Sequence, residues 1–235
     1  MNTDLRYKKG DIVLAERREE KYLITLSEYS KISSRLKQLL TPDKNGIDGK
    51  YSICSLYFDD PFDTALIEKE DGNPVHIKFR IRTYNGEKKI IKLERKTKRG
   101  IVTEKHSAML TEEELDKILS NENIDENSEC FGLVSEMRTK AFRPVVSVKY
   151  NREAYVMPSL GIRVTFDTMI DSLPPEKDSL FGANLPVRPS LPRNEVIMEI
   201  KYSQRCPAFI RRSCKAFGLQ LSVSKYALCR KGELK

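Results

Sequence analysis

The chain has 235 residues and a formal net charge of +8, from 42 Lys and Arg against 34 Asp and Glu. It contains no run of about 18 apolar residues, which excludes a transmembrane helix, and its charged N-terminal segment lacks the apolar stretch of a secretory signal. Five cysteines without metal-ligand spacing, and two histidines, argue against a disulfide framework and a multi-histidine metal site. We expect a single cytoplasmic domain over residues 1–235 with an anionic partner.

Basic residues are concentrated in two segments that flank an acidic one. Residues 75–105 hold eleven Lys and Arg and three Glu, a net charge of +8. Residues 106–136 hold nine acidic residues and one Lys, a net of −8, and residues 193–235 hold ten basic residues and three Glu, a net of +7. A charged segment is usually a solvated surface, so the spacing of the charges must decide whether these segments bind an anion.

The first expected element is a strand over residues 16–24, in which Arg17, Glu19 and Lys21 share one face. Residues 27–40 follow with apolar side chains at helical spacing, which predicts a helix.

Residues 75–84 carry the clearest local pattern, because charged and apolar side chains alternate along them. A period of two predicts a strand with one apolar face and one cationic face. The cationic face presents Lys78, Arg80 and Arg82 in a row, about 6.5–7 Å apart. Such a row is self-repulsive unless an anion lies among the charges, so the pattern favours a site for a polyanion.

A return strand is expected over residues 88–98, after a tight turn at Asn85 and Gly86. Glu94 and Lys96 share one face of this strand. The two strands together predict a hairpin with a cationic face.

The rest of the chain predicts further strands and helices. Helices are expected from a capping box at residues 111–114, over residues 130–140 and over residues 207–217, and the proline-rich residues 171–193 indicate a loop. The expected strands with a charged face are residues 145–155 with Arg152, residues 161–167 with Arg163, Thr165 and Asp167, residues 196–202 with Glu199 and Lys201, and residues 221–226 with Lys225.

An α+β fold satisfies all of these expectations at once. It is a closed antiparallel β-barrel whose lumen is lined by Arg, Lys and a few Glu, with the helices packed outside. Closure of the barrel also removes the exposed edges of the sheet.

The residue types on the charged faces favour phosphate chemistry. Arg and Lys neutralise phosphate oxygens, whereas neither a P-loop nor a Ser/His/Asp constellation is visible. Glu199, beside Lys201, and Glu94, beside Lys96, are candidate ligands for Mg²⁺ or Mn²⁺. The alternative for each Glu is a salt bridge that balances the charge of a neighbouring Arg or Lys.

The order of the motifs resembles the VTC-type polyphosphate polymerase domain of the triphosphate tunnel metalloenzyme (CYTH-like) superfamily, from about residue 16 to residue 228. The motifs are Arg17-x-Glu19-x-Lys21-Tyr22, Ser55-Leu-Tyr-Phe-Asp-Asp60, Lys78-Phe-Arg-Ile-Arg82, Leu93-Glu-Arg-Lys96, Tyr150-Asn-Arg152, Ile162-Arg-Val-Thr-Phe-Asp167, Met198-Glu199-Ile-Lys201-Tyr202 and Ser224-Lys225-Tyr226.

The resemblance implies an eight-stranded tunnel in which an ATP-dependent polymerase transfers the γ-phosphate to a growing polyphosphate chain. It implies that Mn²⁺ or Mg²⁺ is held by Glu199, and that the partners are ATP and inorganic polyphosphate. Glu94 is a second candidate metal ligand, and Arg80, Arg82, Lys96 and Glu199 are the expected catalytic residues. The other expected phosphate-binding residues are Lys21, Lys78, Lys105, Arg152, Arg163, Lys201 and Lys225.

Other functions remain open at this stage. The same fold supports hydrolysis of tripolyphosphate or nucleoside triphosphate, with water as the acceptor. Cyclase or thiamine triphosphatase chemistry fits less well, because Arg17 stands in a first strand that is Glu-rich in those relatives. A non-catalytic polyphosphate-binding module is a further alternative. Nucleic acid is disfavoured, because Trp is absent and only Tyr84 ends a cationic row.

Overall fold

The computed structural model describes residues 18–100, 102–203, 205–215, 220 and 224–233. Its strands form one antiparallel sheet, in which eight strands pair in the order β1-β10-β8-β7-β3-β4-β5-β6. Two short strands attach to this path, β2 to β7 and β9 to β8. The strands are β1 (Arg18–Thr25), β2 (Thr41–Pro42), β3 (Lys50–Asp59), β4 (Val75–Tyr84), β5 (Glu87–Arg99), β6 (Val102–Met109), β7 (Arg143–Met157), β8 (Ile162–Leu173), β9 (Arg188–Pro189) and β10 (Glu195–Tyr202).

The β4–β5 hairpin confirms the alternation seen in the sequence. Asn85 and Gly86 both have positive φ, at 55° and 69°, as a tight two-residue hairpin turn requires. Phe79 and Ile81 are fully buried on one face, where each contributes about 1.5–3 kcal/mol by leaving water. The basic residues of β4 therefore lie on the opposite face.

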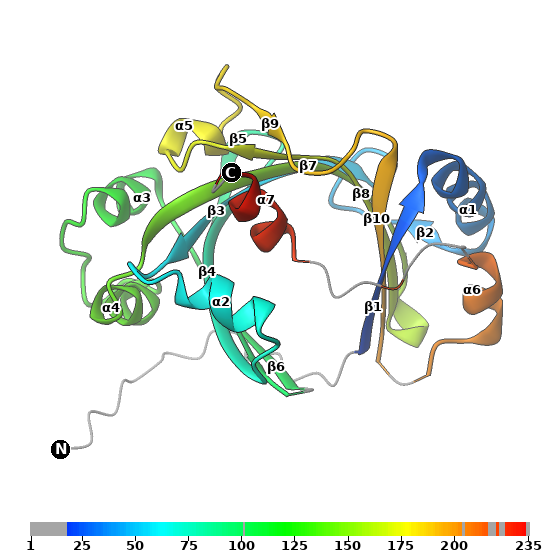
Figure 1. Ribbon diagram of the computed structural model, residues 1–235, viewed down its shortest axis with the longest axis horizontal. Helices are drawn as coiled ribbons and strands as arrows, with labels where there is room; N and C mark the ends of the chain where they lie inside the picture. The colour runs from blue at the N-terminus through cyan, green and yellow to red at the C-terminus, as the bar shows by residue number, and fades with distance from the viewer. Residues whose placement is uncertain (1–17, 101, 204, 216–219, 221–223, 234–235) are drawn as a thin grey trace.

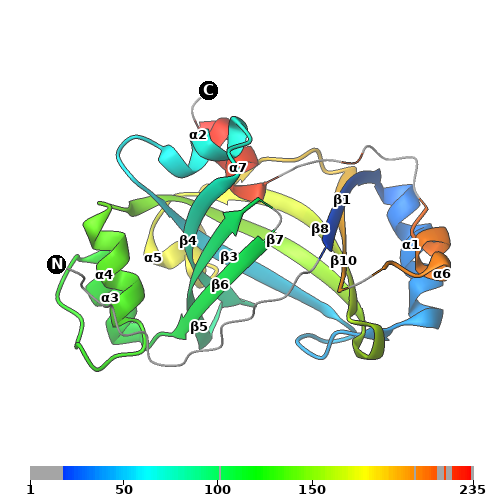
Figure 2. The same ribbon diagram turned by 90° about the horizontal axis from the view of Figure 1, so that it is seen from below.

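The sheet is strongly curved, and most helices cover its convex face (Figure 1). Helices α1 and α6 pack against the β1-β10-β8 half, and α3 and α4 against the β3–β6 half. Figure 2 shows these two pairs at opposite ends of the molecule. The helices are α1 (Leu26–Leu39), α2 (Thr64–Glu70), α3 (Glu112–Leu119), α4 (Phe131–Thr139), α5 (Lys177–Leu180), α6 (Ala208–Ser213) and α7 (Lys225–Glu233), with a 3₁₀ turn at Pro158–Leu160.

Helix α7 lies under the arch of the sheet, on its concave side (Figure 1). Tyr226 and Cys229 are buried there among residues of β3, β7 and β10. Their spacing of three places both side chains on one face of a helix, so the expected strand over residues 221–226 is wrong at residues 225–226. The expectation that the helices pack outside is also wrong for α7. Residues 221–223 lie outside the described residues.

The other helix predictions are largely confirmed. Helix α1 begins at a capping box formed by Thr25 and Glu28, and α3 at one formed by Thr111 and Glu114. Helix α4 lies within the expected residues 130–140. Helix α6 ends at Ser213, earlier than expected, and residues 171–193 contain the end of β8, α5 and β9 rather than loop alone.

The α+β class and the path of eight antiparallel strands are confirmed, whereas closure by backbone pairing is not observed. β1 and β6 are the two ends of the path, and within the described part of the chain they do not pair with each other. Curvature nevertheless brings the two halves together, because the Lys96 Nζ of β5 lies 3.9 Å from the Glu19 Oε2 of β1. In the same part of the chain, every helix is too short or too polar to span a membrane.

Candidate functional site

The basic residues of the hairpin converge on one buried carboxylate. Glu94 accepts a hydrogen bond from Arg80 Nε at 2.7 Å and one from Lys105, and Arg82 Nη1 lies 3.9 Å away. Burial acts to raise the pKa of Glu94, but Arg80 and Arg82 outweigh it and hold that pKa well below its ordinary value. Glu94 is therefore an anion among cations, and its oxygens are already occupied.

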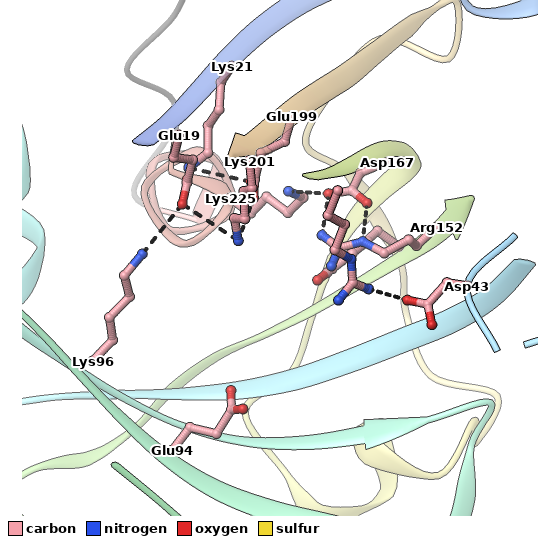
Figure 3. A network of polar contacts seen from close by, with 12 residues as sticks. Glu19, Lys21, Asp43, Glu94, Lys96, Arg152, Asp167, Glu199, Lys201 and Lys225 are labelled. Atoms are coloured by element: carbon pink, nitrogen blue, oxygen red, sulfur yellow. Dashed lines mark hydrogen bonds and ion pairs between the residues drawn. The ribbon is translucent and has the colours of Figure 1, made fainter. Parts of the chain in front are cut away.

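A second carboxylate cluster lies on the β1–β10 half of the concave face (Figure 3). Glu199 Oε1 is 2.6 Å from Lys201 Nζ, and Glu199 Oε2 is 3.8 Å from Lys21 Nζ. Glu19 joins the same cluster, at 2.6 Å from Lys21 and 3.6 Å from Lys201. Burial acts to raise the pKa of Glu199, but Lys201 and Lys21 hold it well below its ordinary value. Lys96 reaches across from β5 to Glu19.

Asp167 is the centre of a third cluster. It is completely buried and accepts two hydrogen bonds from Arg152, Nε at 2.7 Å and Nη2 at 2.8 Å. Lys225 Nζ of α7 lies 2.5 Å from Asp167 Oδ2, the oxygen that also accepts from Arg152 Nη2. This bidentate geometry fixes the Arg152 guanidinium, and Lys225 also lies over the Tyr150 ring.

Arg163 is anchored at one end of the concave face by an acidic and a phenolic side chain. Its Nη2 donates to Asp43 Oδ2 at 2.6 Å and to the Tyr51 hydroxyl at 2.7 Å. Asp43 follows the short strand β2, which the sequence did not predict.

Helix α7 is fastened to the site through Asp59 and Tyr226. The Asp59 carboxylate accepts the backbone N–H groups of Ala65 and Leu66 at the start of α2, and it accepts the Tyr226 hydroxyl. Tyr226 in turn stacks on Tyr57, with the ring centroids 5.2 Å apart. These contacts hold β3, α2 and α7 together and so fix the position of Lys225 on the concave face.

Lys78 lies among other lysines beside α7. Its Nζ donates to Ser224 Oγ at 3.1 Å and lies 5.4 Å from the centre of the Tyr226 ring. Burial, followed by repulsion from Lys69, Lys21 and Lys96, lowers the pKa of Lys78 to about 7. Near neutral pH this group is therefore ready to gain a proton when an anion binds.

The lowered pKa of Lys78 predicts a pH-dependent affinity for phosphate chains. Below pH about 7 the amine is charged, and it becomes neutral as the pH rises through that value. We expect the affinity of the wild type for tripolyphosphate to fall more steeply from about pH 6 to about pH 8 than the affinity of Lys78→Arg, because the guanidinium of the variant stays charged. Titration calorimetry of both proteins checks this, because the ionisation of the ligand is common to them. Parallel pH profiles would contradict it.

The predicted basic residues are brought together, but the two predicted metal ligands are not. The predicted cations that lie on the concave face are Lys21, Lys78, Arg80, Arg82, Lys96, Lys105, Arg152, Arg163, Lys201 and Lys225. They contact tyrosines of the site or one of five carboxylates, which belong to Glu19, Asp43, Glu94, Asp167 and Glu199. Glu94 lies apart from Glu199 in Figure 3. Cations outnumber carboxylates by ten to five in this set, so the face carries an excess of positive charge for an anionic ligand even though Lys78 is only partly charged near neutral pH.

Several residues of the site were not predicted as functional from the sequence. Asp167 was placed on the charged face of its strand without a role, and Glu19 only as part of a motif. Tyr57, Tyr150 and Tyr226 likewise stood in motifs without a role of their own. Asp43 and Tyr51 gave no signal, because the spacing of residues along the chain does not show which residue a loop carboxylate or a phenol will contact. Tyr57 accepts a hydrogen bond from Arg80 at 3.1 Å.

The carboxylates of the site suit a hard cation bound together with a phosphate chain. Among the described residues, no three acidic, His or Cys side chains gather in a group able to hold a metal. Mg²⁺ and similar ions are commonly held by one or two carboxylates plus substrate phosphates. Glu199 and Glu19, which share Lys21 and Lys201, provide such a pair.

Comparisons with known proteins give a family and structures of similar fold. The family model described as the VTC domain matches residues 16–231. The PH1819 protein from Pyrococcus horikoshii OT3 is 14% identical with a TM-score of 0.50, over 93% of this chain and 99% of that chain. A putative adenylate cyclase from Bacillus halodurans is 12% identical with a TM-score of 0.49, over 81% of both chains. No curated protein matches the chain. At such identities, the likeness to PH1819 concerns the fold alone.

Proposed function

Because the chain belongs to the VTC domain family, we propose that it is an ATP-dependent polyphosphate polymerase that transfers the γ-phosphate of ATP to a growing polyphosphate chain. The observation that carries this proposal is the excess of cations over carboxylates on one concave face. This excess of positive charge suits a ligand whose negative charge is repeated along its length, as in a triphosphate or a longer chain.

In this proposal the curved sheet works as a tunnel. Lys96 of β5 and Glu19 of β1 are 3.9 Å apart across the two halves, so side chains rather than a backbone ladder bridge the gap. A lumen open at both ends would let a product chain leave as it grows. Chain length would then not be limited by the size of the site.

We assign Arg80, Arg82 and Lys96 to the transferring phosphate and its neighbours. Glu94 holds Arg80 and Lys105 in place, so these cations are oriented before the ligand arrives. Preorganised charge of this kind is the main source of catalysis in phosphoryl transfer, because little covalent chemistry is left for the protein.

The remaining cations would bind further phosphate groups of the chain along the lumen. Lys21 and Lys201 flank Glu199, and Arg152 and Lys225 flank Asp167. A bound phosphate would compete with these carboxylates for the same donors. Lys78, Lys105 and Arg163 complete the proposed set.

Glu199, with Glu19 beside it, would hold Mn²⁺ or Mg²⁺. The bound ion would neutralise charge on the phosphate oxygens during transfer. Glu94 is the weaker candidate, because Arg80, Arg82 and Lys105 surround it. The chain's own part is to keep both Glu199 and Glu19 ionised, which the adjacent lysines do.

The product of ATP turnover tests the proposal directly. The protein is incubated with ATP and Mn²⁺ or Mg²⁺, and the products are resolved by gel electrophoresis and ion-exchange chromatography. We expect ADP and long-chain polyphosphate. ADP with orthophosphate alone would instead identify a hydrolase, and tight polyphosphate binding without turnover would identify a binding module. The five cysteines are buried and lie outside any disulfide in the described structure, which suits the cytoplasmic location that we also propose.

A further inference from the structure

The lumen contains one buried hydroxyl group that has no role in the clusters described so far. Thr165 is 3% exposed, and its Oγ1 has no hydrogen-bond partner among the described residues. A buried hydroxyl without a partner costs free energy, about 1–3 kcal/mol in typical proteins. A hydroxyl of this kind that also lies among the cations of the site can be satisfied by a bound anion.

The register of the sheet shows which face Thr165 occupies. Its neighbours Val164 and Phe166 are buried in the convex core under α1 and α6, so Thr165 points to the concave side. It lies directly opposite Glu199 of β10 and Ala154 of β7. Ala154 is completely buried and offers no side-chain partner to the hydroxyl.

A second donor on the same face also lacks a partner. Arg163, two residues before Thr165, uses its Nη2 for Asp43 and Tyr51, while its Nε is buried without a hydrogen bond. Side chains two residues apart on a strand lie about 6.5–7 Å apart, a span that one phosphate group with its oxygens can bridge. Because a guanidinium repels a metal ion, the pair calls for an anionic acceptor.

We infer that Thr165 Oγ1 and Arg163 Nε together bind one phosphate group of the chain, next to Glu199. This inference rests on the proposed function and adds Thr165 to the contacts of the lumen. The hydroxyl donates to a non-bridging phosphate oxygen, and the proton stays on the threonine. Arg163 is already held by Asp43 and Tyr51, so it meets the phosphate in a fixed orientation.

Thr165→Val tests the inference, because valine keeps the shape and removes the donor. We expect affinity for inorganic tripolyphosphate, measured by calorimetry without metal, to fall about tenfold or more, since a hydrogen bond to a charged group is lost. The melting temperature of the ligand-free variant should equal or exceed that of the wild type, because an unsatisfied buried hydroxyl is gone. Affinity within about twofold of the wild type would overturn the inference.

Thr97→Val is the matched control. Thr97 is 2% exposed and its Oγ1 also lacks a partner, but it pairs with Ile77, which packs in the convex core. Its replacement should leave tripolyphosphate affinity unchanged. An equal loss in both valine variants would mean that a general packing effect is responsible, and it would also overturn the inference.

A second pair of variants guards against misfolding of Thr165→Val. Thr165→Ser and Thr165→Ala both remove the methyl group and differ only in the hydroxyl. We expect the serine variant to bind tripolyphosphate at least about tenfold more tightly than the alanine variant. Equal affinities of the two variants would contradict the inference. If the wild type itself fails to bind tripolyphosphate, the proposed function is at fault rather than the role of Thr165.

Discussion

Glu199→Gln is expected to slow metal-dependent turnover of ATP by about 10²–10³-fold, yet to bind tripolyphosphate without metal at least as tightly as the wild type. The carboxylate would hold the cation, so its loss removes the ion from the reacting phosphates. The same change removes one of the two carboxylates that pair with Lys21 and Lys201, and leaves them Glu19 alone, so both lysines can meet phosphate more readily. Steady-state rates with Mn²⁺ and calorimetry without it measure the two effects separately.

Glu153→Gln is the control for this change. Glu153 is also a buried carboxylate, but it accepts hydrogen bonds from Tyr29 at 2.6 Å and Tyr155 at 2.7 Å, beneath α1 on the convex side. Its replacement should lower the melting temperature and leave turnover per folded molecule near that of the wild type. If Glu199→Gln retained full metal-dependent turnover, the assignment of the metal to Glu199 would fail.

Arg82→Met is expected to weaken tripolyphosphate binding and to reduce turnover by about 10²–10³-fold, because it removes a preorganised cation from the lumen. The side chain of Arg82 is 10% exposed and donates to Ser55 at 3.2 Å and Tyr150 at 3.4 Å. Methionine fills much of the space of the aliphatic stem. Glu94 keeps Arg80 and Lys105, so the hairpin should still fold.

Arg95→Met provides a matched comparison on the same hairpin. The Arg95 side chain is 12% exposed and pairs with Glu136 of α4, on the convex side. Both variants lose one nearly buried cation and an ion pair, so their stabilities should fall by similar amounts. Polyphosphate synthesis should fall strongly only for Arg82→Met. Equal losses of activity would show that stability, rather than contact with phosphate, is responsible.

Hydrophobic periodicity was sufficient to predict the part of the fold that depends on local pattern. The alternation over β4 and the turn at Asn85 and Gly86 predicted a hairpin with a cationic face, and the structure has it. Residues 145–155, 161–167 and 196–202 were likewise predicted as strands. A strand with one buried face and one charged face can be predicted from the alternation of its own apolar and charged residues.

Long-range partners could not be predicted in this way. Nothing local to Lys225 indicates that it pairs with Asp167, or that Tyr226 meets Asp59. The alternation of Leu221 and Val223 with serines before Lys225 predicted a strand. The burial of Tyr226 and Cys229 against the concave face favours a helix instead. The same limit applies to Glu94, whose cationic partners come from two different strands, Arg80 and Arg82 from β4 and Lys105 from β6.

The pairing of β1 with β10 also has a consequence for the order in which the protein folds. Arg18 pairs with Tyr202, so the first described strand has no partner until nearly all of the chain has been synthesised. Contacts of such high sequence separation are slow to form, and Lys21 therefore meets Glu199 late. A phosphate chain that contacts both strands would bind only when β1 is paired with β10. By mass action, its binding would favour this paired conformation over conformations in which β1 has detached. If the proposed function holds, a bound phosphate chain would therefore also stabilise the pairing of β1 with β10.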